Sequence, residues 1–299
     1  MFKPLCFPYC LVALWFGLIV PSAKATGPFS IGDRLARAYT VYRQQPITTE
    51  DATSSGFAPV NNSYCQPNLG IAYAKGGKPS EREPVMLYFT ASGHISGVGT
   101  LVFGSVESSL LKSGYFVQTG SSTFKISVAF RNASIMCIPD VPPVTGSIGD
   151  RLVVNPSGIA HSIPVTRDTA IAGKFHRGSC FSGMGTHYFY DLESAPKMSW
   201  KSENLLPVVP MYNEAGIINA IFFASSTRQQ TLFPPSANDW EPVPLPNAAM
   251  CKNWCDSDCT FSGTSIWSTM HFYFRDYRKV TCPPTSKCSF KGVSCCPGE

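Results

Sequence analysis

The 299-residue sequence carries little charge. Only 14% of its residues are charged, and the formal net charge is +5. Proteins that bind DNA or RNA present clustered lysine and arginine side chains to the phosphate backbone. A composition so poor in charge does not predict such a surface, and we expect no nucleic-acid partner.

The motifs of several enzyme classes are also missing. The sequence contains neither the Gly-x-Ser-x-Gly elbow of hydrolases nor the His-Glu-x-x-His pattern of zinc proteases. A Gly-Met-Gly segment at Gly183–Gly185 is followed by no Gly-Lys-Ser/Thr and by no helical pattern, so a phosphate-binding loop is not predicted. The motifs therefore point to no particular reaction or substrate.

Long hydrophobic runs are absent beyond the N-terminus. The N-terminal stretch places Lys3 before an apolar run at Leu5–Val20, and Ala23 and Ala25 supply the small residues of a cleavage site. This pattern predicts a signal peptide over residues 1–25, because two prolines leave the run too short for a membrane anchor. We expect a secreted, extracellular protein with no membrane span in its mature form.

What the sequence does contain is an internal repeat. The hexapeptide SIGDRL occurs at Ser30–Leu35 and again at Ser147–Leu152. Other landmarks recur in the same order. These pairs are Cys65 and Cys180, Pro84 and Pro207, Val128–Asn132 and Phe272–Asp276, and Cys137 and Cys282. Landmarks that recur in order predict a duplicated module.

The duplication divides the chain after the signal peptide. We predict a first repeat over 26–143, which is the degenerate copy, and a second repeat over 144–285. The second repeat carries a Pro/Cys-rich insertion at about 228–264, and a Cys-rich tail covers 286–299. Short apolar segments bounded by turn residues, without long amphipathic helical patterns, are typical of β structure. The expected fold class is mainly β: two tandem homologous β-rich domains, stabilised by disulfides, with few or no long helices.

Each repeat contains a predicted hairpin and a predicted closing strand. The hairpins turn at Thr90–Gly93 and Asn213–Gly216, where the glycine supplies the positive φ that such loops need. The closing strands alternate apolar residues on one face, and we expect that face to lie in the core. The predicted core residues are Phe124, Ile126, Val128 and Phe130 in the first repeat and Met270, Phe272 and Phe274 in the second.

Ten of the twelve cysteines lie outside the signal peptide, an even number that favours disulfides in a secreted chain. Cysteines present in both repeats are most simply paired within each repeat, as Cys65–Cys137 and Cys180–Cys282. The other six predict a tail bonded across the insertion in unknown order, although a metal cluster is an alternative. They are Cys251, Cys255 and Cys259 in the insertion and Cys288, Cys295 and Cys296 in the tail. Asn61 and Asn132 begin Asn-x-Ser triplets and are predicted glycosylation sites.

Two histidines occur in the second repeat alone: His187 aligns with Ala72, and His271 with Ser127. Strand alternation places His271 on one side with Tyr273 and Arg275, and His187 on one side with Phe189 and Asp191. If these strands are neighbours, a patch that binds a ligand or a divalent metal is one interpretation. The alternative is that both imidazoles only pack beside aromatic rings. No cofactor is predicted with certainty. The ligand-binding candidates are His187, Tyr188, Asp191, His271, Tyr273 and Arg275.

The second repeat also resembles a group of secreted animal proteins. The resemblance lies in GMGTHYFYDL, in the hairpin PVVPMYNEAGIINAIFFAS and in the closing strand STMHFYF. The group has a Met-Gly-x-His-Tyr segment, a Tyr-Asn hairpin and a Thr-x-His-aromatic strand, and it has no established activity. The positions that carry over are His187, Tyr188, Tyr212, Asn213 and His271. The resemblance implies the β architecture and no chemistry.

Three functions follow as hypotheses. The first is an extracellular binding or recognition protein of unknown ligand, with its site near His187 and His271. The second is a metal-dependent or acid–base hydrolase that uses these histidines, with Asp191 as the orienting group or third ligand. The third is a component of an extracellular matrix or coat.

Overall fold

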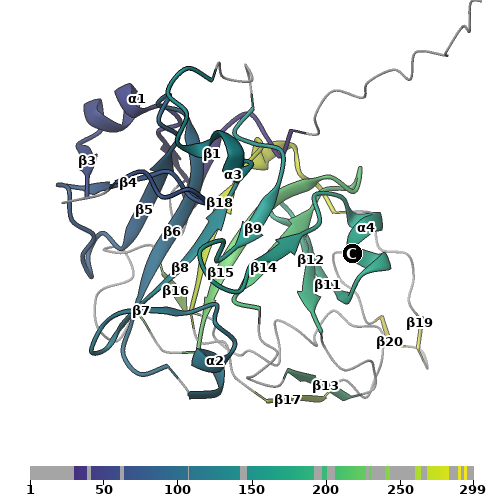
Figure 1. Cartoon of the computed structure of the whole chain (residues 1–299). Helices are drawn as coiled ribbons and strands as arrows, with labels where there is room; N and C mark the ends of the chain where they lie inside the picture. The colour runs from purple at the N-terminus through teal and green to yellow at the C-terminus, as the bar shows by residue number, and fades with distance from the viewer. Residues whose placement is uncertain are drawn as a thin grey trace, which may run out of the picture.

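The computed structural model shows a mainly β protein (Figure 1). The longest helices in the described part of the chain have six residues, so the predicted fold class with few or no long helices is confirmed. The described residues are 30–38, 42–60, 64–106, 108–141, 147–191, 197–200, 206–226, 229, 240–242, 260–263, 268–282, 289–290 and 293–294.

Two sheets of eight strands each form the body of the protein. The first sheet has the order β10-β9-β8-β6-β5-β4-β3, and β7 pairs with β8 at one side. Its strands are β3 (Phe57–Pro59), β4 (Ile71–Lys75), β5 (Val85–Phe89), β6 (Ile95–Phe103), β7 (Val117–Gly120), β8 (Thr123–Ala129), β9 (Leu152–Val154) and β10 (His161–Ile163).

The second sheet has the order β11-β12-β14-β15-β18-β1-β2, and β16 pairs with β18. Its strands are β1 (Leu35–Ala38), β2 (Tyr42–Gln45), β11 (Phe175–Phe181), β12 (Gly185–Tyr190), β14 (Val208–Tyr212), β15 (Ile218–Ser225), β16 (Glu241–Pro242) and β18 (Ser268–Tyr273). Two small sheets pair β13 (Lys197–Trp200) with β17 (Thr260–Gly263) and β19 (Ser289–Phe290) with β20 (Val293–Ser294).

Short helices connect the strands. Thr48 caps the first of them, because its side-chain oxygen accepts a hydrogen bond from the Asp51 amide. The helices are α1 (Thr49–Ser54), α2 (Ser108–Lys112), α3 (Ala133–Met136), α4 (Arg167–Ala172) and the 3-10 helix η3 (Tyr277–Lys279).

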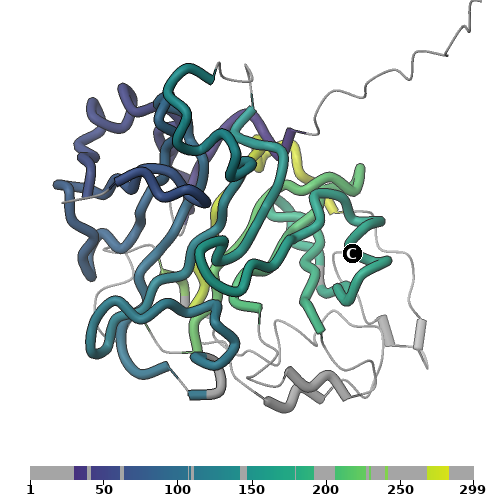
Figure 2. The backbone as a smooth tube through the Cα atoms, in the orientation of Figure 1, coloured from purple at the N-terminus to yellow at the C-terminus, as the bar shows by residue number. Residues whose placement is uncertain are grey.

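The two sheets have the same strand order. In each sheet, the hairpin at one end of that order comes from the other half of the chain. The β1–β2 hairpin extends the second sheet through β18, and the β9–β10 hairpin extends the first sheet through β8. Figure 2 shows the purple N-terminal segment beside the yellow C-terminal segment that results from the first of these pairings. The predicted boundary between residues 143 and 144 therefore separates two sequence repeats and does not separate two sheets.

The two SIGD segments meet where the hairpins cross. The Ile31 amide donates to the Gly149 carbonyl at 2.9 Å, and the Ile148 amide donates to the Gly32 carbonyl at 3.0 Å. The Ser30 hydroxyl also lies 2.8 Å from the Ser147 hydroxyl. Each copy of the hexapeptide thus bonds to the backbone of the other, and the paired hydroxyls give a physical reason for serine at the first position of both copies.

Pairing registers agree between the sheets. Gly97 pairs with Ala129 and Ala220 pairs with Tyr273, which are corresponding positions in the sequence repeats. The β5–β6 and β14–β15 hairpins each shift register once, next to their turns. Gly93 and Gly216 have φ of 83° and 74°, as the hairpin turns require.

The core lies between the inner faces of the two sheets. Residues of both sheets form one buried cluster, in which the Phe130 and Phe274 rings pack edge to face with centroids 5.5 Å apart. The predicted core faces of both closing strands are confirmed, because all their residues are buried. These residues are Phe124, Ile126, Val128 and Phe130 in the first repeat and Met270, Phe272 and Phe274 in the second.

Two disulfides close corresponding loops. Cys65 bonds to Cys137 and Cys180 bonds to Cys282, which are the pairs that the sequence predicts, and each pair has a Cα–Cα distance of 5.7 Å. Within the described residues, no helix has the length and apolar character that crossing a bilayer requires.

Several predictions fall outside the described residues. These are the signal peptide, Asn61, most of the insertion, and the six cysteines Cys251, Cys255, Cys259, Cys288, Cys295 and Cys296. Asn132 is described and exposed, and its side-chain oxygen caps α3. Its glycosylation stays a prediction.

Candidate functional site

The two second-repeat histidines share the outer face of the second sheet, which is the face turned away from the common core. His187 lies on β12 and His271 on β18, and β14 and β15 run between these strands. The ring of Phe222, on β15, lies between them. Its centroid is 5.7 Å from that of His187 and 5.3 Å from that of His271. The two imidazoles are therefore not placed to share one ligand.

His187 is enclosed by aromatic rings. Its side chain is 6% exposed, with the Phe181 ring edge-on at 5.2 Å and the Phe189 ring stacked at 6.4 Å. Contacts of this kind are those of an imidazole that packs with its neighbours.

His271 is bonded to a residue of β16, a short strand that pairs with the first residues of β18. Its Nδ1 atom donates to Glu241 Oε1 at 3.0 Å, and Glu241 belongs to β16. Tyr273 stacks on the imidazole at 6.2 Å and is buried, and burial raises the pKa of its phenol, with the Glu241 carboxylate adding to the effect. The His271 imidazole, the Glu241 carboxylate and the Tyr273 phenol thus fill this part of the outer face of the second sheet.

The other candidates lie apart from the histidines. Tyr188 points to the inner face and packs edge-on against Tyr212, with centroids 5.2 Å apart. Asp191 follows the end of β12 with φ of 53° and forms an ion pair with Lys174 at 3.6 Å. Strand alternation no longer applies there, because the strand ends at Tyr190.

Arg275 lies beyond the end of β18 and joins two backbone segments. Its guanidinium donates to the Ile218 carbonyl at 3.2 Å and to the Ser30 carbonyl at 2.8 Å. Arg131 makes the corresponding bonds in the first repeat, to the Ile95 and Ser147 carbonyls. A role that both repeats preserve in this way is structural. Of the six candidates, only His187, His271 and Tyr273 share a face. Among the described residues no three His, Cys, Asp or Glu side chains gather as metal ligands would.

The outer face of the first sheet has smaller side chains than that of the second sheet at three corresponding positions, and it carries a buried hydrophobic cluster of its own. Gly99 pairs with Ser127 at the position where Phe222 pairs with His271. Ala72 occupies the position of His187, opposite Tyr88 on β5. Small residues thus replace a phenyl ring and two imidazoles on an equivalent backbone.

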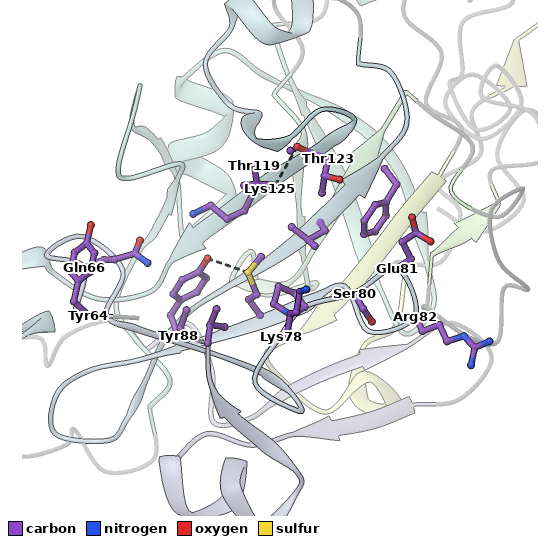
Figure 3. A pocket seen from close by; sticks show the side chains of 17 residues that line it. Tyr64, Gln66, Lys78, Ser80, Glu81, Arg82, Tyr88, Thr119, Thr123 and Lys125 are labelled. Carbon is purple, nitrogen blue, oxygen red and sulfur yellow. Dashed lines mark hydrogen bonds between the residues drawn. The ribbon is translucent and has the colours of Figure 1, made fainter. Parts of the chain in front are cut away.

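A cavity of about 820 Å³ opens beside these positions, and Ala72 is the one of the three small residues that lines it. Its volume is within the size range of sites for small organic ligands. Figure 3 shows the side chains that line it. Its floor is apolar and buried, and comes from β4, β5 and β6. The floor residues are Ala72, Met86, Tyr88, Leu101 and Phe103.

A lysine of the closing strand faces the cavity. Lys125 lies on β8 opposite Leu101 and is partly buried, and burial lowers the pKa of its amine. Its amine makes no hydrogen bond or ion pair with any described residue. Partial burial of a cation without a partner is unfavourable, so this amine is available to an incoming acceptor.

Tyr88 supplies a second polar atom at the same place. Its side chain is buried, which raises the pKa of the phenol, and its hydroxyl has the Met86 sulfur as its acceptor at 3.9 Å. A thioether is a weak acceptor. The hydroxyl lies 3.3 Å from where a Cβ of Gly99 would stand, so the absence of a side chain at Gly99 makes room for it. In Figure 3 the Lys125 amine and the Tyr88 hydroxyl lie on the same side of the cavity, with the Tyr88 hydroxyl directed to the Met86 sulfur.

Sequence reasoning missed this cavity because it searched for chemically distinctive residues. The nearest signal was a loss of side-chain volume beside the cavity: at corresponding positions the first repeat has Gly97 and Gly99, and the second has Ala220 and Phe222. Comparison with protein-family models, with curated proteins and with solved structures found no match. The resemblance to secreted animal proteins therefore stays a prediction.

Proposed function

We propose that the protein is a secreted, disulfide-bonded binding protein that holds a small, mainly apolar ligand in the cavity of the first sheet. The observation that carries this proposal is the cavity of about 820 Å³ over a buried apolar floor. A concave apolar surface with a few convergent polar groups is the usual form of a small-molecule site. Burial of a ligand's apolar surface there contributes about 0.8 kcal/mol for each CH₂ group removed from water.

The second-repeat histidines do not carry a competing proposal. His187 packs among rings and His271 is bonded to Glu241, so a hydrolase that uses both is less well supported than binding in the cavity.

The test uses N-phenyl-1-naphthylamine, an uncharged dye whose emission rises when it leaves water. We expect saturable binding to the full secreted protein and binding about tenfold weaker, or more, to Leu101→Trp, because the indole occupies the cavity. Ile171→Trp is the matched control, because Ile171 is exposed on α4 and the added ring stays outside the cavity.

Leu101→Phe provides a smaller obstruction if the tryptophan variant does not fold. The proposal is wrong if the wild-type protein does not bind the dye saturably. It is equally wrong if a folded Leu101 variant binds the dye as tightly as wild type does.

A further inference from the structure

The charged residues of the cavity favour one sign of charge on a ligand. Among the described residues, three cations line the cavity, Lys78, Arg82 and Lys125, against the one carboxylate of Glu81. Figure 3 shows Arg82 and Glu81 at one end, with Arg82 extending away, and Lys125 and Tyr88 at the other. An anion is therefore electrostatically favoured over a cation throughout the site.

The apolar floor and the polar end lie side by side on neighbouring strands. Lys125 is directly opposite Leu101, and Met86 is opposite Gly99, under the Tyr88 hydroxyl. A ligand that covers this floor with an apolar body thus brings one of its ends to the amine and the phenol.

We propose that the ligand is an amphiphile with an anionic head group, which pairs with the Lys125 ammonium and accepts a hydrogen bond from the Tyr88 hydroxyl. Its apolar part lies over Met86, Leu101 and Phe103. This inference rests on the proposed function, since it assigns a ligand class to the same cavity.

Two physical arguments favour the anion. A carboxylate or phosphate oxygen gives the Lys125 ammonium the partner it lacks among the described residues, and charge-assisted hydrogen bonds are about twice as strong as neutral ones. The same oxygen is a stronger acceptor for the Tyr88 hydroxyl than the Met86 thioether, so the buried phenol gains a better hydrogen bond on binding. An uncharged alcohol of the same chain length offers these donors only a neutral oxygen, so it forms weaker hydrogen bonds and no ion pair.

The experiment compares ligands that share one alkyl chain and differ in the head group: dodecanoate, dodecyl phosphate, dodecanol and dodecylamine. The affinity of each amphiphile is measured by its displacement of the neutral dye from the full secreted protein. The amphiphile is kept below the concentration at which it forms micelles. We expect dodecanoate or dodecyl phosphate to bind at least about tenfold more tightly than dodecanol, and dodecylamine to bind most weakly. The tighter of the two anions identifies the head group as a carboxylate or a phosphate.

Lys125→Gln is expected to abolish the difference between the anions and dodecanol while dye binding persists. Lys112→Gln removes the same charge from an exposed position on α2 and is expected to preserve the difference. Lys125→Met, which also removes the charge, repeats the test if the glutamine variant does not fold.

The outcomes separate the two proposals. If the dye and all four amphiphiles fail to bind, the proposed function is wrong. If the dye and dodecanol bind but the anions have no advantage, the ligand class alone is wrong. If Lys125→Gln retains that advantage, the pairing of the head group with Lys125 is wrong.

Discussion

Gly99 and Phe222 occupy corresponding positions in two sheets with the same register, and they give those positions opposite properties. The Phe222 ring packs against His187 and His271 and helps to fill the outer face. At Gly99 there is no side chain, and the Tyr88 ring leans over the backbone beside a cavity. Packing interactions act over a few ångströms, so the space over Gly99 is taken by the Tyr88 ring of the next strand, whereas Phe222 fills its position with its own ring.

Tyr212 also shows how burial changes a single residue. Its hydroxyl donates to the Pro164 carbonyl at 2.6 Å, and burial raises the pKa of the phenol above its ordinary 10.0. The neutral phenol is favoured in the folded protein, so its contribution to stability is complete below about pH 10 and is lost as the pH rises further.

We expect Tyr212→Phe to lower the free energy of unfolding by about 1–3 kcal/mol at neutral pH, because the Pro164 carbonyl loses its donor. We also expect a smaller loss of stability above about pH 10 than in wild type. Urea unfolding at neutral and alkaline pH measures both effects. Tyr64→Phe, at a residue that is 75% exposed, is the control. An unchanged alkaline loss in Tyr212→Phe would contradict the argument.

At the scale of secondary structure, the important event is the exchange of hairpins at the SIGD segments. Gly32 passes so close to Phe274 that an added Cβ would lie 2.0 Å from its carbonyl oxygen, and Gly149 passes Phe130 in the same way at 2.1 Å. In each case a residue of one repeat touches the closing strand of the other. Only glycine allows the backbone to approach this closely.

We expect Gly32→Ala and Gly149→Ala each to lower the free energy of unfolding by about 2–4 kcal/mol, through backbone displacement at the crossing. Gly120→Ala is a suitable control, since the nearest atom to its added Cβ would be 3.5 Å away. Thermal and urea unfolding give the comparison. A crossing glycine that tolerates alanine as well as Gly120 does would show that the close approach is not required.

For the whole molecule, the exchange means that neither sheet can be completed by one repeat. The first sheet contains β9 and β10 from the second repeat, and the second sheet contains β1 and β2 from the first. The two described disulfides each lie within one repeat and do not join the repeats covalently. The association of the repeats therefore depends on strand pairing and on the shared core.

We expect the repeats to stay together after the chain is cut between them. A protease site introduced between Val141 and Ser147 gives two fragments on a denaturing, non-reducing gel. Gel filtration of the cut protein under native conditions should give one species of unchanged size, because two pairs of strands and one core hold the fragments together. Separation of the fragments without denaturant would show that the hairpin exchange contributes little.

Several elements were predictable because short-range patterns encode them. Alternating apolar residues placed Phe124 and Ile126 in the core, and the turn at Thr90–Gly93 identified its hairpin. The exchange was not predictable, because the repeats are alike and β1 presents a similar edge to β8 and to β18. For the candidate site, alternation correctly placed Tyr273 beside His271. It did not apply to Arg275 or Asp191, because their strands end before them.

Neighbouring residues in the sequence were sufficient to specify the strands, the turns and the cysteines that pair, because these features depend on side-chain alternation, on local φ and on a repeated order of landmarks. The exchange of hairpins that completes the sheets and the position of the cavity could be recognised only in the tertiary structure. Which of two similar hairpins joins a sheet depends on free energies summed over distant contacts. Where a cavity lies depends on the space that side chains from five strands leave unfilled. Lys125 and Tyr88 became a candidate site only once folding brought β5 and β8 to opposite sides of two glycines on β6.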